Sequence, residues 1–312
     1  MRKFLSYGFV LFLCLSSCRE EFVFEAPEEE TRLNLFAEIN PAEPVSLSLL
    51  TSYSFGSDGS FEAPEDAQIY LDGRELGTEG TNFTYDEKRE KYMLTNPFFR
   101  PREKSYYEVM AYVPGMEVDT IRARTYVPAS IPIEDFIILS NEPLVTGEDR
   151  EKRLLRLQFK IGTPEEYPAY LHVLPQRFIS EFRTSDQGEV IITDTNDSEH
   201  FTIAEIANNK NAVVSFEHKE GVFVDYSRLG EEYIELELIT QTSLLTKKDV
   251  MRLLKFEIRA ITQELYDYHI SLHRQLISNR TSLTYPVNQY SNVENGRGIF
   301  GAYSAKVHIV PL

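Results

Sequence analysis

The chain has 312 residues, a formal net charge of −17 and 42% hydrophobic residues. It is long enough for one large or two ordinary domains, and it carries enough apolar side chains to bury a core. So acidic a chain does not suit nucleic acid, whose phosphates are bound by clustered Lys and Arg, nor does it suit lying on an anionic membrane.

The amino terminus predicts the export signal of a lipoprotein. Arg2 and Lys3 precede an apolar run over residues 4–15, too short to span a bilayer as a helix of roughly 20 residues. The next residues, up to Cys18, read Leu-Ser-Ser-Cys and have the form of a lipobox, whose cysteine thiol receives a diacylglycerol. We therefore expect residues 1–18 to be the signal peptide, with Cys18 as the lipidated first residue of the mature chain. The alternative is an ordinary cleaved signal that contains a cysteine.

Cysteine usage agrees with this interpretation. Cys14 would leave with the signal, so Cys18 would be the only cysteine of the mature chain, which excludes a disulfide and a cysteine-based zinc site. Arg19 stands where an Asp is associated with inner-membrane retention in some bacteria, and Glu20 and Glu21 resemble the acidic signal of surface-exposed Bacteroidetes lipoproteins. We expect a lipid-anchored protein of the outer membrane, displayed at the cell surface.

Residues 19–31 are acidic and contain Pro27, which predicts a tether; a first strand over residues 22–24 is the alternative. From Leu33 on, apolar residues recur with a period of two, which indicates half-buried strands. These residues are Leu33, Leu35, Ala37 and Ile39, then Val45, Leu47, Leu49 and Tyr53, then Ala67, Ile69 and Leu71, and then Tyr107, Val109, Ala111 and Val113. Asp72-Gly73 predicts a hairpin turn, and residues 118–127 a further strand. Six or seven short strands in about 100 residues predict an immunoglobulin-like β-sandwich over residues 32–129.

Pro128 and Pro132 mark a boundary, and residues 130–312 are expected to form a second β-rich domain. Alternation resumes there at Leu155, Leu157, Phe159 and Ile161, and again at Ile234, Leu236 and Leu238. One segment has helical spacing instead, with apolar side chains at Leu265, Tyr268, Leu272 and Leu276. Thr262 is placed to cap this helix and Asn279 to stop it, so we expect one amphipathic helix near residues 262–279. The predicted fold class is mainly β, a sandwich followed by a β-rich domain with one helix.

Gly296, Gly298 and Gly301 match the dinucleotide pattern GxGxxG. That fingerprint requires a strand before it, a helix after it and a second parallel strand beyond. Eleven residues follow Gly301, and residues 306–310 have the pattern of a closing strand, so no such unit fits. We interpret the glycines as a tight turn or bulge.

Two further groups of residues resemble parts of known metal sites. His269 and His273 lie four apart on the predicted helix, but a metalloprotease helix needs Glu after the first His, and Ile270 stands there. Asp194, Asn196 and Ser198 imitate the start of a calcium loop without its glycine and distal Glu. For both we favour solvated or structural roles. We expect no metal, no cofactor and no catalytic residue, because no nucleophile elbow, P-loop or zinc-protease pattern occurs.

The carboxyl-terminal stretch from Tyr285 to Tyr303, which contains Ser-Asn-Val-Glu-Asn-Gly-Arg-Gly-Ile-Phe-Gly, resembles the closing signature of the Bacteroidetes domain-of-unknown-function family 4249. The segment from Phe256 to Leu276, a strand followed by a Tyr-rich helix, is also similar to that family. The segment around Tyr167 and Tyr170 departs from the Asn-Tyr-Tyr type expected there.

The resemblance implies a setting and no catalytic residues. Such proteins are similar to lipoproteins encoded beside SusC-like TonB-dependent receptors. This implies an accessory or ligand-capturing lipoprotein that works with such a receptor in nutrient uptake, attached to the membrane through its lipid anchor. Two alternatives from other classes stay open: a structural or adhesive surface protein, and a hydrolase whose site is assembled from scattered carboxylates and histidines.

Overall fold

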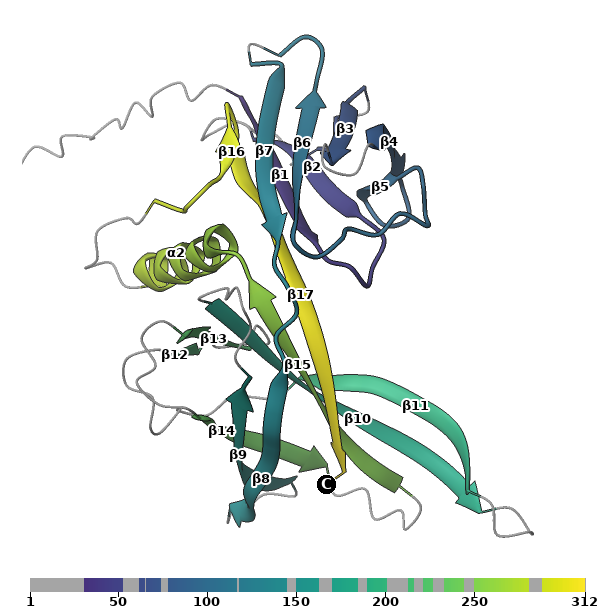
Figure 1. Ribbon diagram of the computed structural model, residues 1–312, viewed down its shortest axis with the longest axis vertical. Helices are drawn as coiled ribbons and strands as arrows, with labels where there is room; N and C mark the ends of the chain where they lie inside the picture. The colour runs from purple at the N-terminus through teal and green to yellow at the C-terminus, as the bar shows by residue number, and fades with distance from the viewer. Residues whose placement is uncertain are drawn as a thin grey trace, which may run out of the picture.

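The computed structural model describes residues 31–52, 62–64, 66–73, 78–116, 118–144, 150–162, 170–184, 190–200, 213–215, 221–226, 233–243, 250–280 and 288–311. These residues are mainly β structure, as predicted, with the helix α2 (Figure 1). The predicted signal peptide, Cys18 and the tether lie outside the described residues. Among the described helices, none is long and apolar enough to cross a membrane.

Seven strands form the N-terminal half of the molecule. They are β1 (Arg32–Ile39), β2 (Ser46–Ser52), β3 (Gln68–Gly73), β4 (Thr78–Asp86), β5 (Lys91–Leu94), β6 (Ser105–Tyr112) and β7 (Thr120–Val127). Neighbouring strands are antiparallel in the order β1-β2-β5-β4-β3-β6-β7. Every second residue of β1 and β6 is buried, because successive side chains of a strand point to opposite faces and one face covers the core.

The predicted alternation is confirmed at most of these positions. Buried side chains that were expected include Leu33, Leu35, Leu47, Leu49, Ile69, Leu71, Tyr107 and Val109. Tyr53 lies outside the described residues. The predicted hairpin exists between β3 and β4, but Asp72 and Gly73 are still strand residues, and Gly73 pairs with Thr78 across a register shift. The Asp-Gly pair is therefore part of the strand and is not itself the turn.

The C-terminal half contains two packed layers. One is a three-stranded sheet in the order β14 (Tyr233–Ser243), β9 (Arg150–Ile161), β8 (Ile133–Leu144). The other contains β10 (Tyr170–Thr184), β11 (Val190–His200), β12 (Val213–Ser215), β13 (Val222–Asp225) and β15 (Val250–Ile261). Phe136 of β8 stacks on Phe159 of β9 in the same sheet, with ring centroids 5.9 Å apart. It also contacts Phe256 of β15 in the other layer, with ring centroids 5.1 Å apart. The predicted core residues Leu155, Leu157, Phe159, Ile161, Ile234 and Leu236 are all buried here.

The last strand belongs to both halves. After the two-residue strand β16 (Val293–Glu294), β17 (Arg297–Pro311) pairs in parallel with β1 from Arg297 to Ala302. It then pairs antiparallel with β15 from Tyr303 to Pro311. In Figure 1 it runs as one long yellow strand from beside β1 down into the lower half. The predicted closing strand over residues 306–310 is therefore the end of a much longer strand. This strand pairs with β1 of the N-terminal half and with β15 of the C-terminal half.

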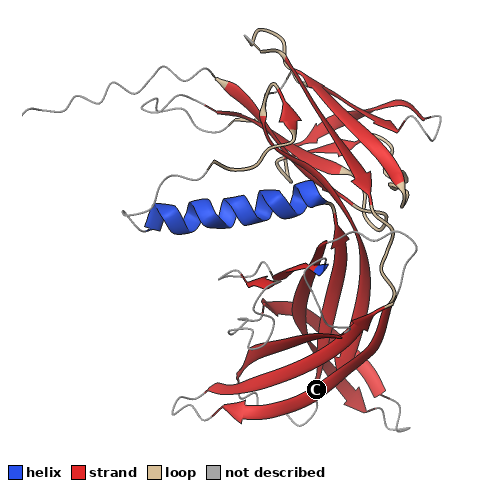
Figure 2. Cartoon of the chain, turned by 60° about the vertical axis from the view of Figure 1, so that its left-hand side comes forward, coloured by secondary structure: helices blue, strands red, loops and turns tan. Residues whose placement is uncertain are grey.

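The helix α2 (Gln263–Arg280) is the predicted amphipathic helix. The Thr262 hydroxyl accepts the Leu265 backbone N–H at 3.3 Å, and the Thr262 carbonyl accepts that of Tyr266 at 3.0 Å, so Thr262 is the cap. Leu265 and Tyr268 are buried, but Leu276 is 51% exposed. Figure 2 shows why: only the first turns lie against the sheets, and the rest of the helix extends away from them.

Candidate functional site

The glycine pattern sits where β17 meets β1. The left-handed residues here are Asn295 (φ 60°), in the turn between β16 and β17, and Gly298 (φ 111°), the second residue of β17; Gly296 is not left-handed. A Cβ at Gly298 would overlap the Leu35 carbonyl oxygen, and one at Gly296 would come within 2.8 Å of the Leu33 carbonyl oxygen. A Cβ at Gly301 would press on Leu265 of α2. Gly298 and Gly301 lie within β17 and Gly296 directly before it, so these glycines permit close packing and do not form a dinucleotide loop.

Asn292 fixes this turn, and sequence reasoning did not single it out. Its side-chain amide donates to the Phe300 carbonyl oxygen and accepts the Phe300 N–H, each at 2.9 Å. The two bonds pin the segment before β16 to β17. The Asn in the family-like signature was the available signal.

The structure places both His269 and His273 on α2, four residues apart as predicted. His269 belongs to a polar group at the junction of the two halves, where it contacts Glu38. We define the junction cluster as Glu38 of β1, His172 of β10, Arg259 of β15, His269 of α2 and Tyr303 of β17. His269 Nε2 lies 3.3 Å from Glu38 Oε1, and an Arg259 terminal nitrogen lies 3.7 Å from Glu38 Oε2. The guanidinium of Arg259 lies 4.1 Å from the Tyr303 ring centroid.

Electrostatics in this cluster favour charged Glu38. Desolvation alone would raise the pKa of its carboxyl group, but the hydrogen bond with His269 and the positive charges of His269, Arg259 and His172 outweigh it and lower that pKa. Burial raises the pKa of Tyr303 to about 12, so its hydroxyl stays protonated, and it accepts a hydrogen bond from the Asn40 side-chain amide at 2.9 Å.

The junction cluster fits a structural role better than a chemical one. His172 stacks on Phe223 with centroids 4.0 Å apart, and Arg259 also holds Glu257 at 2.7 Å. Within the described residues, no three His, Cys, Asp or Glu side chains lie close enough to hold a metal ion. The cluster joins β1 to α2 and β15. The Nδ1 atom of His269 is buried and has no hydrogen-bond partner.

The side chains of Asp194, Asn196 and Ser198, on β11, lie outside the described residues.

A second feature missed by sequence reasoning is the turn between β5 and β6, which we call the Phe98 turn (residues 95–104). Phe98 is 89% exposed, while the next residue, Phe99, packs edge-on against Tyr107 with centroids 6.2 Å apart. Asn96 holds the turn through its Oδ1, which accepts the Phe98 N–H at 3.1 Å, and through its carbonyl, which accepts the Phe99 N–H at 3.2 Å. The turn thus presents an aromatic side chain on a fixed backbone.

Basic residues flank Phe98 on this otherwise acidic chain. Arg100 donates to the carbonyl oxygens of Pro97 and Phe99 at 2.6 and 2.8 Å, which braces the turn. Arg102 and Lys104 are exposed in the same turn, with the exposed Glu103 between them, so the turn keeps a net positive charge. Two adjacent Phe residues between Pro97 and Pro101 were the sequence signal, because apolar residues bounded by prolines outside any alternating run are unlike a strand.

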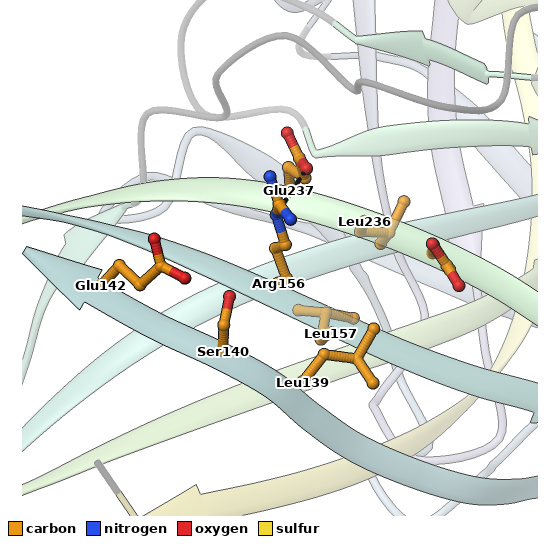
Figure 3. A pocket seen from close by; sticks show the side chains of 8 residues that line it. Leu139, Ser140, Glu142, Arg156, Leu157, Leu236 and Glu237 are labelled. Carbon is orange, nitrogen blue, oxygen red and sulfur yellow. Dashed lines mark ion pairs between the residues drawn. The ribbon is translucent and has the colours of Figure 1, made fainter. Parts of the chain in front are cut away.

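A pocket of about 190 Å³ lies on the three-stranded sheet (Figure 3). Leu139, Leu157 and Leu236 form its apolar part, with Glu142, Glu235 and Glu237 around them. Figure 3 shows Arg156 reaching from β9 towards Glu237 of β14, at 2.7 Å. Gln158 likewise donates to Glu235 at 3.2 Å. Cross-strand partners therefore already engage two of its three carboxylates, and the pocket carries no further argument for a ligand.

A family model described as "Domain of unknown function (DUF4249)" matches residues 19–308, nearly the whole chain. No curated protein matches the chain.

Proposed function

The chain belongs to the DUF4249 family, and from this premise we propose that it is an outer-membrane lipoprotein that works by binding. In this proposal it is the accessory or ligand-capturing partner of a SusC-like TonB-dependent receptor, held at the cell surface by the lipid on Cys18. The lipobox supports the anchor, and the acidic segment over residues 19–31 supports a tether that lets the body reach a neighbour.

We also propose that the two halves are two domains. Residues 32–129 would be an immunoglobulin-like sandwich and residues 130–312 a second domain that lends its last strand to the first. Seven antiparallel strands and separate apolar cores for the two halves support this division. The shared strand β17 would hold the two parts in one orientation, as a surface that recognises a large partner requires.

The observation that carries a binding function is the exposure of Phe98 on a braced turn. Binding hot spots are enriched in aromatic and Arg side chains, and a backbone that is ordered beforehand loses little entropy on association. Phe98 is an exposed aromatic side chain on a hydrogen-bonded turn, and Arg102 is exposed in the same turn. We propose that the Phe98 turn contacts an acidic, apolar site on the extracellular loops of the receptor.

The test is capture of the receptor from outer-membrane extracts by the lipid-free mature protein. We expect a TonB-dependent receptor in the eluate, and Phe98→Ala should weaken binding by about 30-fold, equivalent to about 2 kcal/mol. Leu276→Ala is the control, because it removes another exposed apolar side chain, 51% exposed, from α2. Equal capture by wild type and Phe98→Ala would remove the turn from the interface.

Anchoring is tested separately with a fatty-acid label. Cys18→Ala should lose the label and release the protein from membranes, because the lipid is the only strong attachment proposed. A label retained by Cys18→Ala would contradict the lipoprotein interpretation, whatever the receptor experiment shows.

The alternatives give different results. Deleting the gene should impair uptake of one nutrient class if the receptor partnership is correct. Normal uptake without a receptor partner would favour a structural or adhesive protein. Turnover of a peptide, ester or glycoside substrate that is lost on mutating a single carboxylate or His would favour a hydrolase.

A further inference from the structure

Within the described part of the chain, the lower half of β17 is paired along one edge only. From Tyr303 to Pro311 it pairs with β15 on one side, through nine consecutive residues without a register shift. On the other side, β1 pairs with β17 only as far as Ala302. Among the described strands, none pairs with that side beyond Ala302, and Figure 1 shows β17 continuing well past the end of β1.

Edge strands usually carry features that prevent further pairing, and the neighbouring edge strand β8 has several. Asp135 has a φ of 49°, the register with β9 shifts twice, and Pro143 lies near the end of the strand. From Tyr303 to Pro311 β17 has a regular ladder without a register shift, in which Lys306 is the only charged residue and Pro311 is the last residue. Because β17 has neither the left-handed residue nor the register shifts of β8, its second edge can pair with another strand.

The side chains along this edge are apolar on the outer face. Val307 is 50% and Ile309 is 60% exposed, and Ala305 lies on the same face two residues before. Lys306 and His308 alternate to the other face, where the His308 ring stacks on Phe136 with centroids 5.1 Å apart. A strand that completes the edge must therefore bring apolar side chains to the outer face and avoid a positive charge opposite Lys306.

We propose that this edge pairs with the same strand of a second copy, antiparallel and with the two-fold axis at Val307. Such a pairing places Val307 opposite its own copy and Ala305 opposite Ile309, so the outer face becomes one apolar stripe. Lys306 then faces His308 of the other copy. Burial and the nearby Lys306 lower the pKa of His308, so its imidazole is neutral at pH 7 and places no second positive charge opposite the lysine.

The dimer is expected to be weak and to respond to salt. One strand pair buries less than the roughly 1,200 Å² of a stable interface, which points to a dissociation constant of about 10–100 µM. Both copies are strongly acidic, at −17 for the full chain and −19 without Arg2 and Lys3 of the signal, so they repel each other at long range. Raising the salt from about 0.05 to 0.5 M should therefore strengthen the dimer, because screening removes the repulsion and leaves the apolar contact.

Cross-linking through a single thiol tests the register. In the mature chain without its signal and with Cys18→Ala, Val307→Cys supplies the only thiol. Residues directly opposite in an antiparallel pair lie about 4.5–5.5 Å apart between Cα atoms, within disulfide reach. Air oxidation should cross-link Val307→Cys into a dimer. Leu276→Cys, a control with the same exposure on α2, should stay largely monomeric.

Analytical ultracentrifugation provides the second measurement. The lipid-free chain should dimerise as its concentration rises to about 500 µM, and Ile309→Lys should weaken the dimer at least about tenfold by adding charge to the stripe. Leu276→Lys should leave it unchanged. A monomer at the highest concentration, a dimer indifferent to Ile309→Lys, or equal cross-linking at positions 307 and 276 would each overturn the proposal. The monomer would point to a strand from a different protein.

Discussion

The backbone of Gly298 has a φ of 111° and lies directly against the Leu35 carbonyl of β1. Gly298→Val would combine left-handed backbone strain, about 1–3 kcal/mol, with an overlap that only separation of the two strands can relieve. We expect the free energy of unfolding to fall by at least about 3 kcal/mol, measured by urea denaturation. Receptor capture by the protein that stays folded should not change.

Gly115 offers a control at the same scale. Its φ is 86°, but a Cβ there would meet no atom within 4 Å, so Gly115→Ala adds strain without overlap. The loss of stability should be about 1 kcal/mol. Similar losses for both variants would mean that close packing on β1 is not what requires Gly298.

At the scale of elements, Glu38 links β1 to α2 and β15 through His269 and Arg259. Its pKa is lowered from 4.5 in the folded state, so its contribution to stability is present above pH 4.5 and is lost as the pH falls through the folded pKa. The wild-type melting temperature should therefore fall more steeply between about pH 5 and 3 than that of Glu38→Gln. The carboxylate is 34% exposed, so the difference should stay within about 1 kcal/mol. Parallel pH profiles would contradict this contribution.

The elements that sequence predicted are those with local causes. The alternation of Leu33, Leu35, Ala37 and Ile39 and the cap at Thr262 each depend on neighbours a few residues away, and the structure confirms them. The parallel pairing of β1 with β17 joins residues more than 250 apart, and no local pattern encodes it. The junction cluster could not be predicted for the same reason, because it depends on which distant strands become neighbours. The Phe98 turn, in contrast, had a local signal in the paired Phe residues between Pro97 and Pro101.

For the whole molecule, the consequence of β17 is cooperativity. The two halves bury separate apolar cores, which alone would favour two unfolding transitions, and a smaller third cluster packs Phe36 of β1 against α2. One strand pairs with β1 above and with β15 below, so neither half can lose it without disturbing the other. We expect the mature chain to unfold in a single calorimetric transition, with equal calorimetric and van't Hoff enthalpies. Two resolved transitions in the wild type would show that β17 does not couple the halves.

Ser304 is the place to break this coupling, because it lies on β17 just past the last residue paired with β1. Ser304→Pro removes the N–H and disturbs the β15 ladder while leaving residues 297–302 with β1, so the single transition should split and the C-terminal half should melt first. Ser304→Ala is the matched control. The Ser304 hydroxyl is buried and has no hydrogen-bond partner, so its removal should keep one transition and change stability by no more than about 1 kcal/mol. A single transition in Ser304→Pro, shifted as a whole, would mean that the halves are coupled through other contacts, of which the junction cluster is the nearest.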